Sequence, residues 1–208
     1  MERAFRTLHE TGRSEIEIKR SRFLGIAEPV HDEAGFQDLL ARVRAAHPEA
    51  SHHAFAYRLG REGETARFSD AGEPGGTAGR PMMEVLIREE VVDAGVVVTR
   101  YFGGTLLGSG GLTRAYGQTA AEAIRAAGFA RMRPHTEMLV TIDYGQYGGM
   151  EQALQRANLG VSETTFTDTV SLVVRVPAGE EDAFTSMVAD LTAGVGLVEP
   201  GKTVFLPE

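Results

Sequence analysis

The sequence of 208 residues contains no cysteine. This absence excludes disulfide bonds, thiolate catalysis, cysteine-ligated zinc and iron–sulfur clusters. A metal ion would have to be held by histidine and carboxylate side chains alone. We therefore expect no disulfide-linked partner, and we predict neither a metal site nor a cofactor.

The sequence also lacks long apolar runs. No segment approaches the ~18 uncharged apolar residues that a membrane-spanning helix requires. The first residues, MERAFRTLHETGRSE, have no apolar core of the kind found in signal peptides. Hydrophobic residues make up 42% of the chain and charged residues 24%, as in ordinary globular domains. We expect a cytoplasmic protein with no membrane partner.

Acidic residues outnumber basic ones, and the net charge is −8. The excess is confined to one part of the chain. Before His135 the sequence has 18 Arg plus Lys and 18 Asp plus Glu, and from His135 onward it has 3 and 11. The acidic part is expected to repel a phosphate backbone, whereas the neutral part can still carry a local basic patch.

Residues 15–130 alternate between strand-like and helix-like hydrophobic patterns. The alternating segment 15–30 predicts one or two strands, and Phe36, Leu39, Leu40 and Val43 have helical spacing. The further predicted elements are a hairpin turning at Gly60–Gly63, a short helix MMEVLIREE, a strand GVVVTRYF buried on both faces, and a long helix from Leu112 to Gly128. This part of the chain is therefore predicted to be a sheet covered by helices.

The last third of the chain has the element order β-α-β-β-α-β, from MLVTIDY to TVFLP. This order is the split βαβ, or ferredoxin-like, pattern. Composition changes at RMRPHT, residues 131–136, where we place a linker. We therefore predict an α+β protein with two domains, residues 1–135 and residues 136–208.

The segment TRYFGGTLLGSGGLTRAYG, residues 99–117, concentrates glycine between a predicted strand and a predicted helix. Backbone N–H groups in such a turn can bind an anion, and Arg100 and Arg114 could flank a phosphate. The segment matches neither the P-loop nor the GxGxxG fingerprint, because no Lys-Ser or Lys-Thr pair follows and Thr113 occupies the third glycine position. The alternative is that the glycines serve only tight backbone packing.

A second glycine-rich segment, RFSDAGEPGGTAGRP, is a predicted loop at residues 70–81 with polar side chains around it. Asp70 and Glu73 are candidates for a general base or a metal ligand. The alternative is a tight loop in which Asp and Thr side chains cap neighbouring backbone groups. We expect this loop and the first glycine-rich segment to meet, because both follow strands of the same small domain.

Histidines and aromatic residues offer weaker signals. His52 and His53 open a predicted strand, so they are expected on opposite faces of the sheet. Lone histidines without a partner at a recognisable spacing are more often structural than metal ligands. Aromatic side chains of the sheet could stack on bases, although we expect at most one or two to be exposed. No Ser-His-Asp order, GxSxG elbow or HExxH helix is present.

These considerations give one set of candidate residues for anion or nucleic-acid binding. The set combines four arginines, one of them in the preceding predicted strand, with polar and glycine residues of the two segments. Its members are Arg58, Ser69, Asp70, Glu73, Gly75, Gly76, Thr77, Arg80, Arg100, Gly103, Gly104, Gly108, Ser109, Gly110, Gly111 and Arg114. No catalytic residue is assigned.

Three segments, HHAFAYR, RFSDAGEPGGTAGRPM and VVVTRYFGGTLLGSGGLTRAYG, closely resemble the YigZ/IMPACT family. Their order and spacing match over residues ~15–130, and the segment from Arg100 to Gly108 is the most specific. The rest of the chain resembles the small C-terminal domain of bacterial YigZ-like members in size and strand order.

The resemblance implies an N-terminal β/α sandwich like the second domain of a small-subunit ribosomal protein, a fold shared with elongation factor G and small-molecule kinases. It implies a C-terminal ferredoxin-like domain similar to those of elongation factor G. Eukaryotic IMPACT proteins regulate translation initiation by restraining a stress-activated kinase through its ribosome-associated activator. The related kinases bind nucleotide phosphates with a glycine- and serine-rich turn, and LGSGGL is a loose version of that turn.

We therefore expect a translation-associated regulatory protein that binds RNA, a nucleotide phosphate or the ribosome through its glycine-rich loops. One alternative is a regulator that contacts only other proteins of a translation-control pathway. Another is an enzyme acting on a small phosphorylated substrate, with Asp70 or Glu73 as base and Gly108–Gly111 with Arg114 as anion site. The absence of standard catalytic motifs favours a protein that is not an enzyme.

Overall fold

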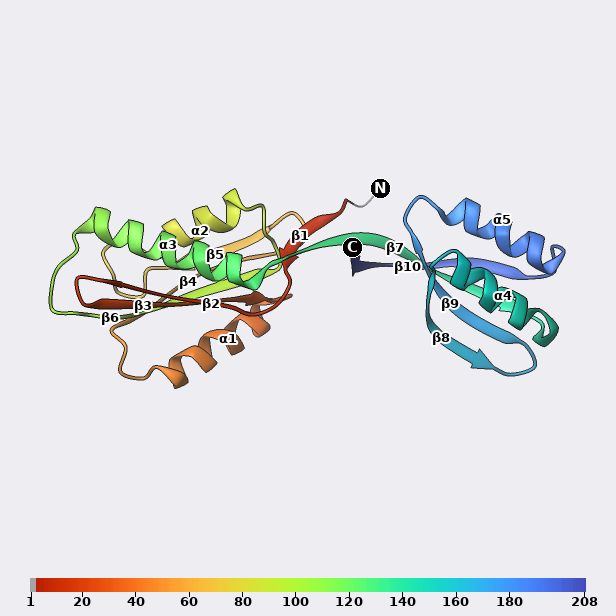
Figure 1. Ribbon diagram of the computed structural model, residues 1–208, viewed down its shortest axis with the longest axis horizontal. Coiled ribbons are helices and arrows are strands. Elements are labelled where there is room, and N and C mark those ends of the chain that lie inside the picture. The colour runs from red at the N-terminus through yellow and green to blue at the C-terminus, as the bar shows by residue number, and fades with distance from the viewer. Residues whose placement is uncertain (1–2) are drawn as a thin grey trace. The chain divides into compact units, whose positions relative to one another are not determined.

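The structure, a computed structural model, describes residues 3–208. The chain divides into two compact units (Figure 1). The N-terminal unit is Phe5–Arg131, and the C-terminal unit is Met132–Glu208 together with the described residues before Phe5. Within the described chain there are two five-stranded sheets and helices packed on them, so the protein is α+β.

The sheet of the N-terminal unit is antiparallel and has the strand order β2-β3-β6-β4-β5. Helix α1 packs on one face, and helices α2 and α3 pack on the other (Figure 1). The elements are β2 (Gly12–Ile18), β3 (Ser21–Pro29), α1 (Glu33–Ala46), β4 (His52–Leu59), β5 (Thr65–Ser69), α2 (Gly79–Arg88), β6 (Ala94–Tyr101) and α3 (Ser109–Ala127).

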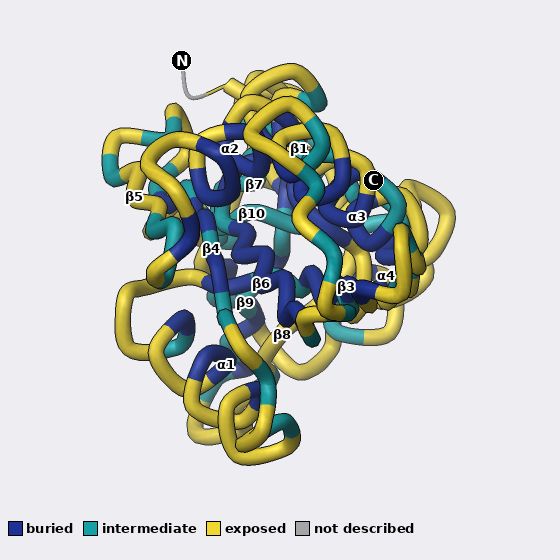
Figure 2. The backbone as a smooth tube through the Cα atoms, turned by 90° about the vertical axis from the view of Figure 1, so that its left-hand side faces the viewer, coloured by how far each residue is buried: buried dark blue, intermediate teal, exposed yellow. Residues whose placement is uncertain are grey.

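Strand β6 lies at the centre of this sheet and is buried along almost its whole length (Figure 2). Successive side chains point to opposite faces of a strand. Val96 and Val98 accordingly pack in the core under α2 and α3, whereas Val97 packs in the core under α1. The predicted strand buried on both faces is confirmed.

The predicted helices of the N-terminal unit are present, with two shifted starts. Helix α1 has the expected core positions, and the Asp32 side chain caps it by accepting a hydrogen bond from Gly35 N at 2.7 Å. Helix α2 begins at Gly79, inside the segment that we predicted as loop. Helix α3 begins at Ser109, three residues before the predicted start at Leu112.

The second sheet is built around β7, with the order β1-β7-β9-β8 and β10 also pairing with β7. Helices α4 and α5 share one core with β7 and β9, and the expected β-α-β-β-α-β element order is present. The elements are β1 (Phe5–Leu8), β7 (Phe129–Ile142), α4 (Tyr144–Arg156), β8 (Gly160–Phe166), β9 (Val170–Pro177), α5 (Glu181–Thr192) and β10 (Leu197–Pro207).

The segment RMRPHT, which we predicted as a linker, lies inside β7. Its composition indicates a linker, but residues 132–136 pair in register with β10, from Pro207 back to Thr203. Pro134 has no N–H to donate, and its carbonyl accepts a hydrogen bond from Ala178 N at 3.0 Å. Strand pairing with distant residues therefore overrides the local composition.

None of the helices within residues 3–208 is long and apolar enough to cross a membrane.

Candidate anion-binding site

The two glycine-rich segments line one cavity of about 400 Å³ in the N-terminal unit. We call it the loop cavity. It lies between the first loop, residues 70–78, and the second loop, residues 102–108, beside the start of α3. Its lining residues are His52, Glu73, Pro74, Arg100, Phe102, Leu106, Leu107, Gly108, Ser109 and Leu112. The two segments therefore lie side by side around one cavity, as we expected.

The start of α3 presents unused backbone donors at the loop cavity. Gly108 is the N-cap with φ +72°, a left-handed conformation that favours glycine, and no side chain caps the helix within the described chain. The first intrahelical donor is Leu112 N, which bonds to Gly108 O at 3.0 Å. The N–H groups of Ser109, Gly110 and Gly111 therefore have no partner in the helix, and they carry its positive dipole end.

Arg100 brings a cation to the wall of the same cavity. Its side chain is almost completely buried, and the whole residue is 4% exposed. Nη1 donates to Glu73 Oε1 at 2.7 Å and Nη2 donates to Ser21 Oγ at 3.4 Å. Its buried Nε has no hydrogen-bond partner within residues 3–208. A buried charge requires partners, and this guanidinium has donor capacity left over.

Glu73 ties the first loop to the sheet and to α3. Its Oε1 accepts hydrogen bonds from Arg100 and, at 2.7 Å, from the hydroxyl of Tyr116, which is fully buried. Burial raises the pKa of Tyr116, and the bond to Glu73 raises it further, so the phenol remains protonated. Glu73 is thus committed to a buried network, which fits a structural role for this carboxylate.

His52 also lines the loop cavity, although we did not include it among the candidates. Its Nδ1 donates to Ala71 O at 2.9 Å, and its Nε2 lies 3.9 Å from Glu73 Oε1. His53 bonds to Thr99 Oγ1 at 3.1 Å on the opposite face, as strand alternation predicts. Burial lowers the pKa of His53, and Arg44 lowers it further. A lone histidine has no spacing signal, so only the fold reveals which of the two reaches the cavity.

Asp70 acts as a cap for the first loop and for α2. Its carboxylate accepts hydrogen bonds from the backbone N–H groups of Gly76, Ala78 and Gly79 at 2.8–3.0 Å. Burial opposes ionisation, but these three bonds together hold the pKa of Asp70 below its ordinary value. The geometry matches the capping alternative for this residue.

Among residues 3–208 no group of three or more His, Asp or Glu side chains is placed to hold a metal ion.

The other polar and glycine candidates of the first loop lie in its internal hydrogen bonds or at its surface. Thr77 Oγ1 donates to Pro74 O at 2.7 Å, and Ser69 Oγ accepts from Ala71 N at 3.2 Å. Gly75 and Gly76 are exposed.

In the second loop, Gly103 packs against the preceding β2–β3 turn. A Cβ there would lie 2.1 Å from the backbone carbon of Arg20, and its N–H donates to Ser21 Oγ at 3.1 Å. Gly104 faces open space. The loop is therefore anchored at its start by close backbone packing.

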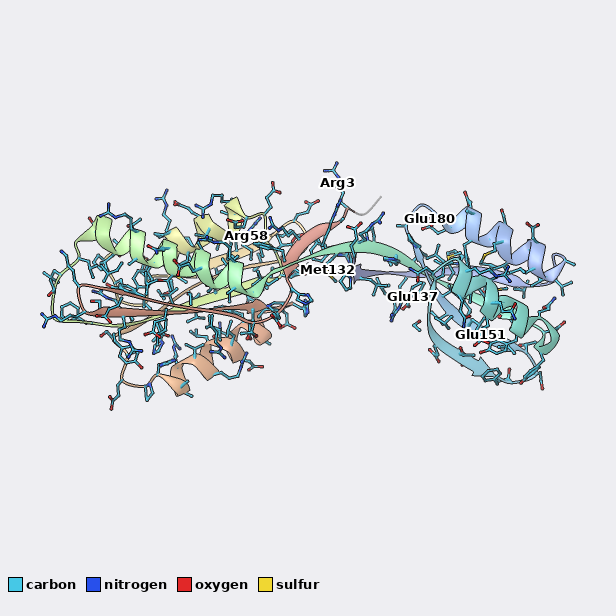
Figure 3. The ribbon with its side chains drawn as sticks, in the orientation of Figure 1. Arg3, Arg58, Met132, Glu137, Glu151 and Glu180 are labelled. Atoms are coloured by element: carbon cyan, nitrogen blue, oxygen red, sulfur yellow. The ribbon has the colours of Figure 1, made fainter. Side chains whose placement is uncertain are left out.

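Of the four candidate arginines, only Arg100 lines the loop cavity. Arg58, labelled in Figure 3, donates to the carbonyls of Val91 and Glu62. Arg80 is exposed and pairs with Glu84 at 3.1 Å. Arg114 is exposed on α3, with no hydrogen bond or ion pair within the described chain. Residue type predicted cations near both loops, but it did not predict which of them point toward the cavity.

The apolar members of the cavity wall were not among the candidates. Phe102 is 48% exposed and Leu106 is 83% exposed, whereas Leu107 is partly buried against the core. Phe102 and Phe68 are the exposed aromatic side chains of the N-terminal unit within the described chain, in line with our expectation of one or two. An exposed phenylalanine inside a glycine-rich segment was the available signal for this part of the site.

Comparison with known proteins places the chain in a family. The family model described as the Impact N-terminal domain matches residues 19–124, which is more than half of the chain. The chain belongs to the IMPACT family. A second model, a domain of unknown function (DUF1949), matches residues 140–195 of this IMPACT-family chain. The family resemblance found in the sequence is confirmed.

Individual members of the IMPACT family match most of the chain. The IMPACT family member YvyE of Bacillus subtilis is 34% identical over 96% of this chain and 92% of its own length. The IMPACT family member YigZ of Escherichia coli is 36% identical over 86% of this chain and 88% of its own length. A crystal structure of a protein described as hypothetical is 32% identical, with a TM-score of 0.67 over 97% of this chain and 99% of that chain.

Proposed function

We propose that this IMPACT-family protein is a translation-associated regulator that binds a phosphate group of RNA, of the ribosome or of a nucleotide in the loop cavity. The observation that carries the proposal is the start of α3, where the first turn has free N–H groups and where Gly108 and Ser109 line the same cavity as Arg100. A regulator of translation would act in the cytoplasm.

Helix geometry and charge both support an anion at this position. The N-terminus of a helix carries the equivalent of roughly half a positive charge. N–H groups that have no partner in the helix can donate to phosphate oxygens. The guanidinium of Arg100 adds an unpartnered Nε donor, while its charge is balanced by the ion pair with Glu73, which lines the same cavity. The site is therefore suited to a phosphate held mainly by backbone donors.

The finer fold assignments belong to the same proposal. We propose that the C-terminal unit is a ferredoxin-like domain, because β10, β7, β9 and β8 lie side by side in this order with antiparallel pairing. We propose that the N-terminal unit is like the second domain of a small-subunit ribosomal protein. Translation factors combine domains of these kinds, which supports a role near the ribosome.

The test is a pair of substitutions that are isosteric with each other, Gly110→Asp and Gly110→Asn. A Cβ at this position meets no atom within 4 Å, so both side chains fit the fold. The aspartate places a negative charge where we expect the phosphate, while the asparagine differs only in charge. Aspartate in the first turn also suits the helix dipole, so we expect unchanged or higher stability.

Binding is measured by filter retention of RNA and by co-sedimentation with ribosomes across a salt series. We expect the wild type and Gly110→Asn to bind at low salt and to weaken as salt rises, since phosphate contacts are salt-sensitive. Gly110→Asp should lose about tenfold or more in affinity. No binding by the wild type at low salt, or equal binding by both variants, would contradict the proposal. Co-sedimentation that survives nuclease treatment and the aspartate would favour the alternative of a purely protein-binding regulator.

A further inference from the structure

The loop cavity has an apolar wall beside its anion-binding end. Phe102 and Leu106 both line it, and both expose large apolar surfaces. A site for phosphate alone needs no such wall, because a bare phosphate has no apolar surface to cover. The combination of free N–H groups, a cation and an exposed aromatic ring matches a ligand with an anionic end and a flat apolar end.

The backbone of Phe102 is anchored before any ligand binds, and its ring lies beside Arg100. The backbone N–H of Phe102 donates to Ser51 Oγ at 3.2 Å, and the Arg100 guanidinium lies 5.4 Å from the ring centroid. The next residue, Gly103, is fixed by its close approach to Arg20. An anchored backbone limits the conformational freedom that Phe102 loses on binding, so a stacked ligand gains more of the contact free energy.

The size of the cavity limits what can enter it. About 400 Å³ lies at the lower end of the range for small-molecule sites, and it suits one nucleotide unit. A base in a duplex is stacked and paired, so its ring is not available to a protein side chain. Unpaired bases can be splayed out and stacked on aromatic side chains.

We propose that the loop cavity binds a single unpaired nucleotide unit, with its phosphate on the N-terminus of α3 and its base stacked on Phe102 and covered by Leu106. This inference rests on the proposed phosphate site and adds the class of ligand. The unit can come from a single-stranded RNA or from a free mononucleotide, which share this chemistry. A duplex presents the phosphate without the base.

The experiment titrates the full chain with five probes: inorganic phosphate, ribose 5-phosphate, adenosine 5′-monophosphate, a single-stranded RNA pentamer, and a blunt-ended RNA duplex with the pentamer sequence at its centre. Affinities are measured by calorimetry, and the amide signals of Gly110 and Gly111 are followed by NMR. Stacking of one base on an aromatic ring changes affinity by about tenfold or more. We expect the mononucleotide or the pentamer to bind at least tenfold more tightly than ribose 5-phosphate and the duplex.

Phe102→Ala should abolish this tenfold preference and leave the amide shifts caused by inorganic phosphate unchanged. Phe102→Trp should retain the preference, since it restores a stacking surface. Phe68→Ala is the matched control, because Phe68 is 49% exposed in the same unit and does not line the cavity. Thermal unfolding of each variant shows whether the fold is intact.

The outcomes separate the two proposals. If phosphate shifts Gly110 and Gly111 but the base adds no affinity, or if Phe102→Ala keeps the preference, the nucleotide inference is wrong and the phosphate site stands. If none of the probes shifts these amides, both proposals fall. Tighter binding of the pentamer than of the mononucleotide identifies an RNA strand as the source, and the reverse order identifies a free nucleotide.

Discussion

The Glu73–Arg100–Tyr116 network offers the most direct test of how the loop cavity is held together. Glu73 and Arg100 are 8% and 4% exposed, and both Arg100 Nη1 and the Tyr116 hydroxyl lie 2.7 Å from Glu73 Oε1. The substitution Glu73→Gln keeps the size of the side chain and one carbonyl oxygen as acceptor. It removes the negative charge and leaves the buried Arg100 without a counter-ion.

The expected cost follows from this geometry. Removing one partner from a buried ion pair costs ~3–5 kcal/mol, because the other charge stays buried without compensation. Since the glutamine can still accept from both donors, we expect the lower end, about 3 kcal/mol. For a unit of this size, that loss lowers the Tm by about 10 °C.

The assay is urea and thermal unfolding followed by far-UV circular dichroism. The loss should appear in the transition of the N-terminal unit, because all three residues belong to it. Glu84→Gln is the matched control, since Glu84 is exposed and forms an i,i+4 pair with Arg80. Such a pair contributes about 0.5 kcal/mol or less. If Glu73→Gln were as stable as Glu84→Gln, the charge of Glu73 would not be what compensates Arg100, and the reasoning would fail.

The remaining predictions concern pH. The folded-state pKa of Asp70 is lowered, so its ionised form contributes stability above about pH 4, and this contribution is lost as the pH falls through the folded-state pKa. Asp70→Asn should therefore be less stable than the wild type at pH 7, and the difference should shrink as the pH falls below about 4, as measured by urea unfolding across this range. The pKa of Tyr116 is raised, so its contribution is present below about pH 10 and lost above it. The stability advantage of the wild type over Tyr116→Phe should fall by about 1.4 kcal/mol per pH unit above pH 10, and a constant advantage up to pH 11 would show that the phenol is not held in its protonated form.

Local sequence patterns predicted the helices and strands whose own apolar residues form the core. The apolar run of β6 and the helical spacing in α1 and α3 were sufficient to predict those elements. Strand β7 could not be predicted through residues 131–136, since its pairing partner β10 lies about 70 residues further along the chain. Composition reports local preference, whereas strand pairing depends on contacts that are distant in sequence.

The site was predicted in outline and not in detail, for the same reason. Arg100 stands in the predicted segment, yet its burial depends on Glu73, which lies 27 residues earlier in another loop. Tyr116 lies on the buried face of α3, which the sequence predicted as a long helix. Its hydroxyl belongs to the buried network, and hydrophobic periodicity carries no information on that bond. Tertiary contacts decide which side chains reach the cavity, so His52 of β4 and Phe102 of the second loop were identified as site residues only from the structure.

The glycines of the second loop and of the start of α3 are needed for different physical reasons. Gly103 is required by packing, because a Cβ would lie 2.1 Å from the backbone of Arg20, and Gly108 is required by its positive φ. Gly110 meets neither condition, since it has helical geometry and open space where a Cβ would lie. Glycine in a helix costs up to about 1 kcal/mol relative to alanine, and neither packing nor conformation in this fold offsets that cost. What the missing side chain does provide is an uncovered N–H in the first turn of α3, next to Ser109, which lines the loop cavity. A phosphate site at this helix start requires such a donor.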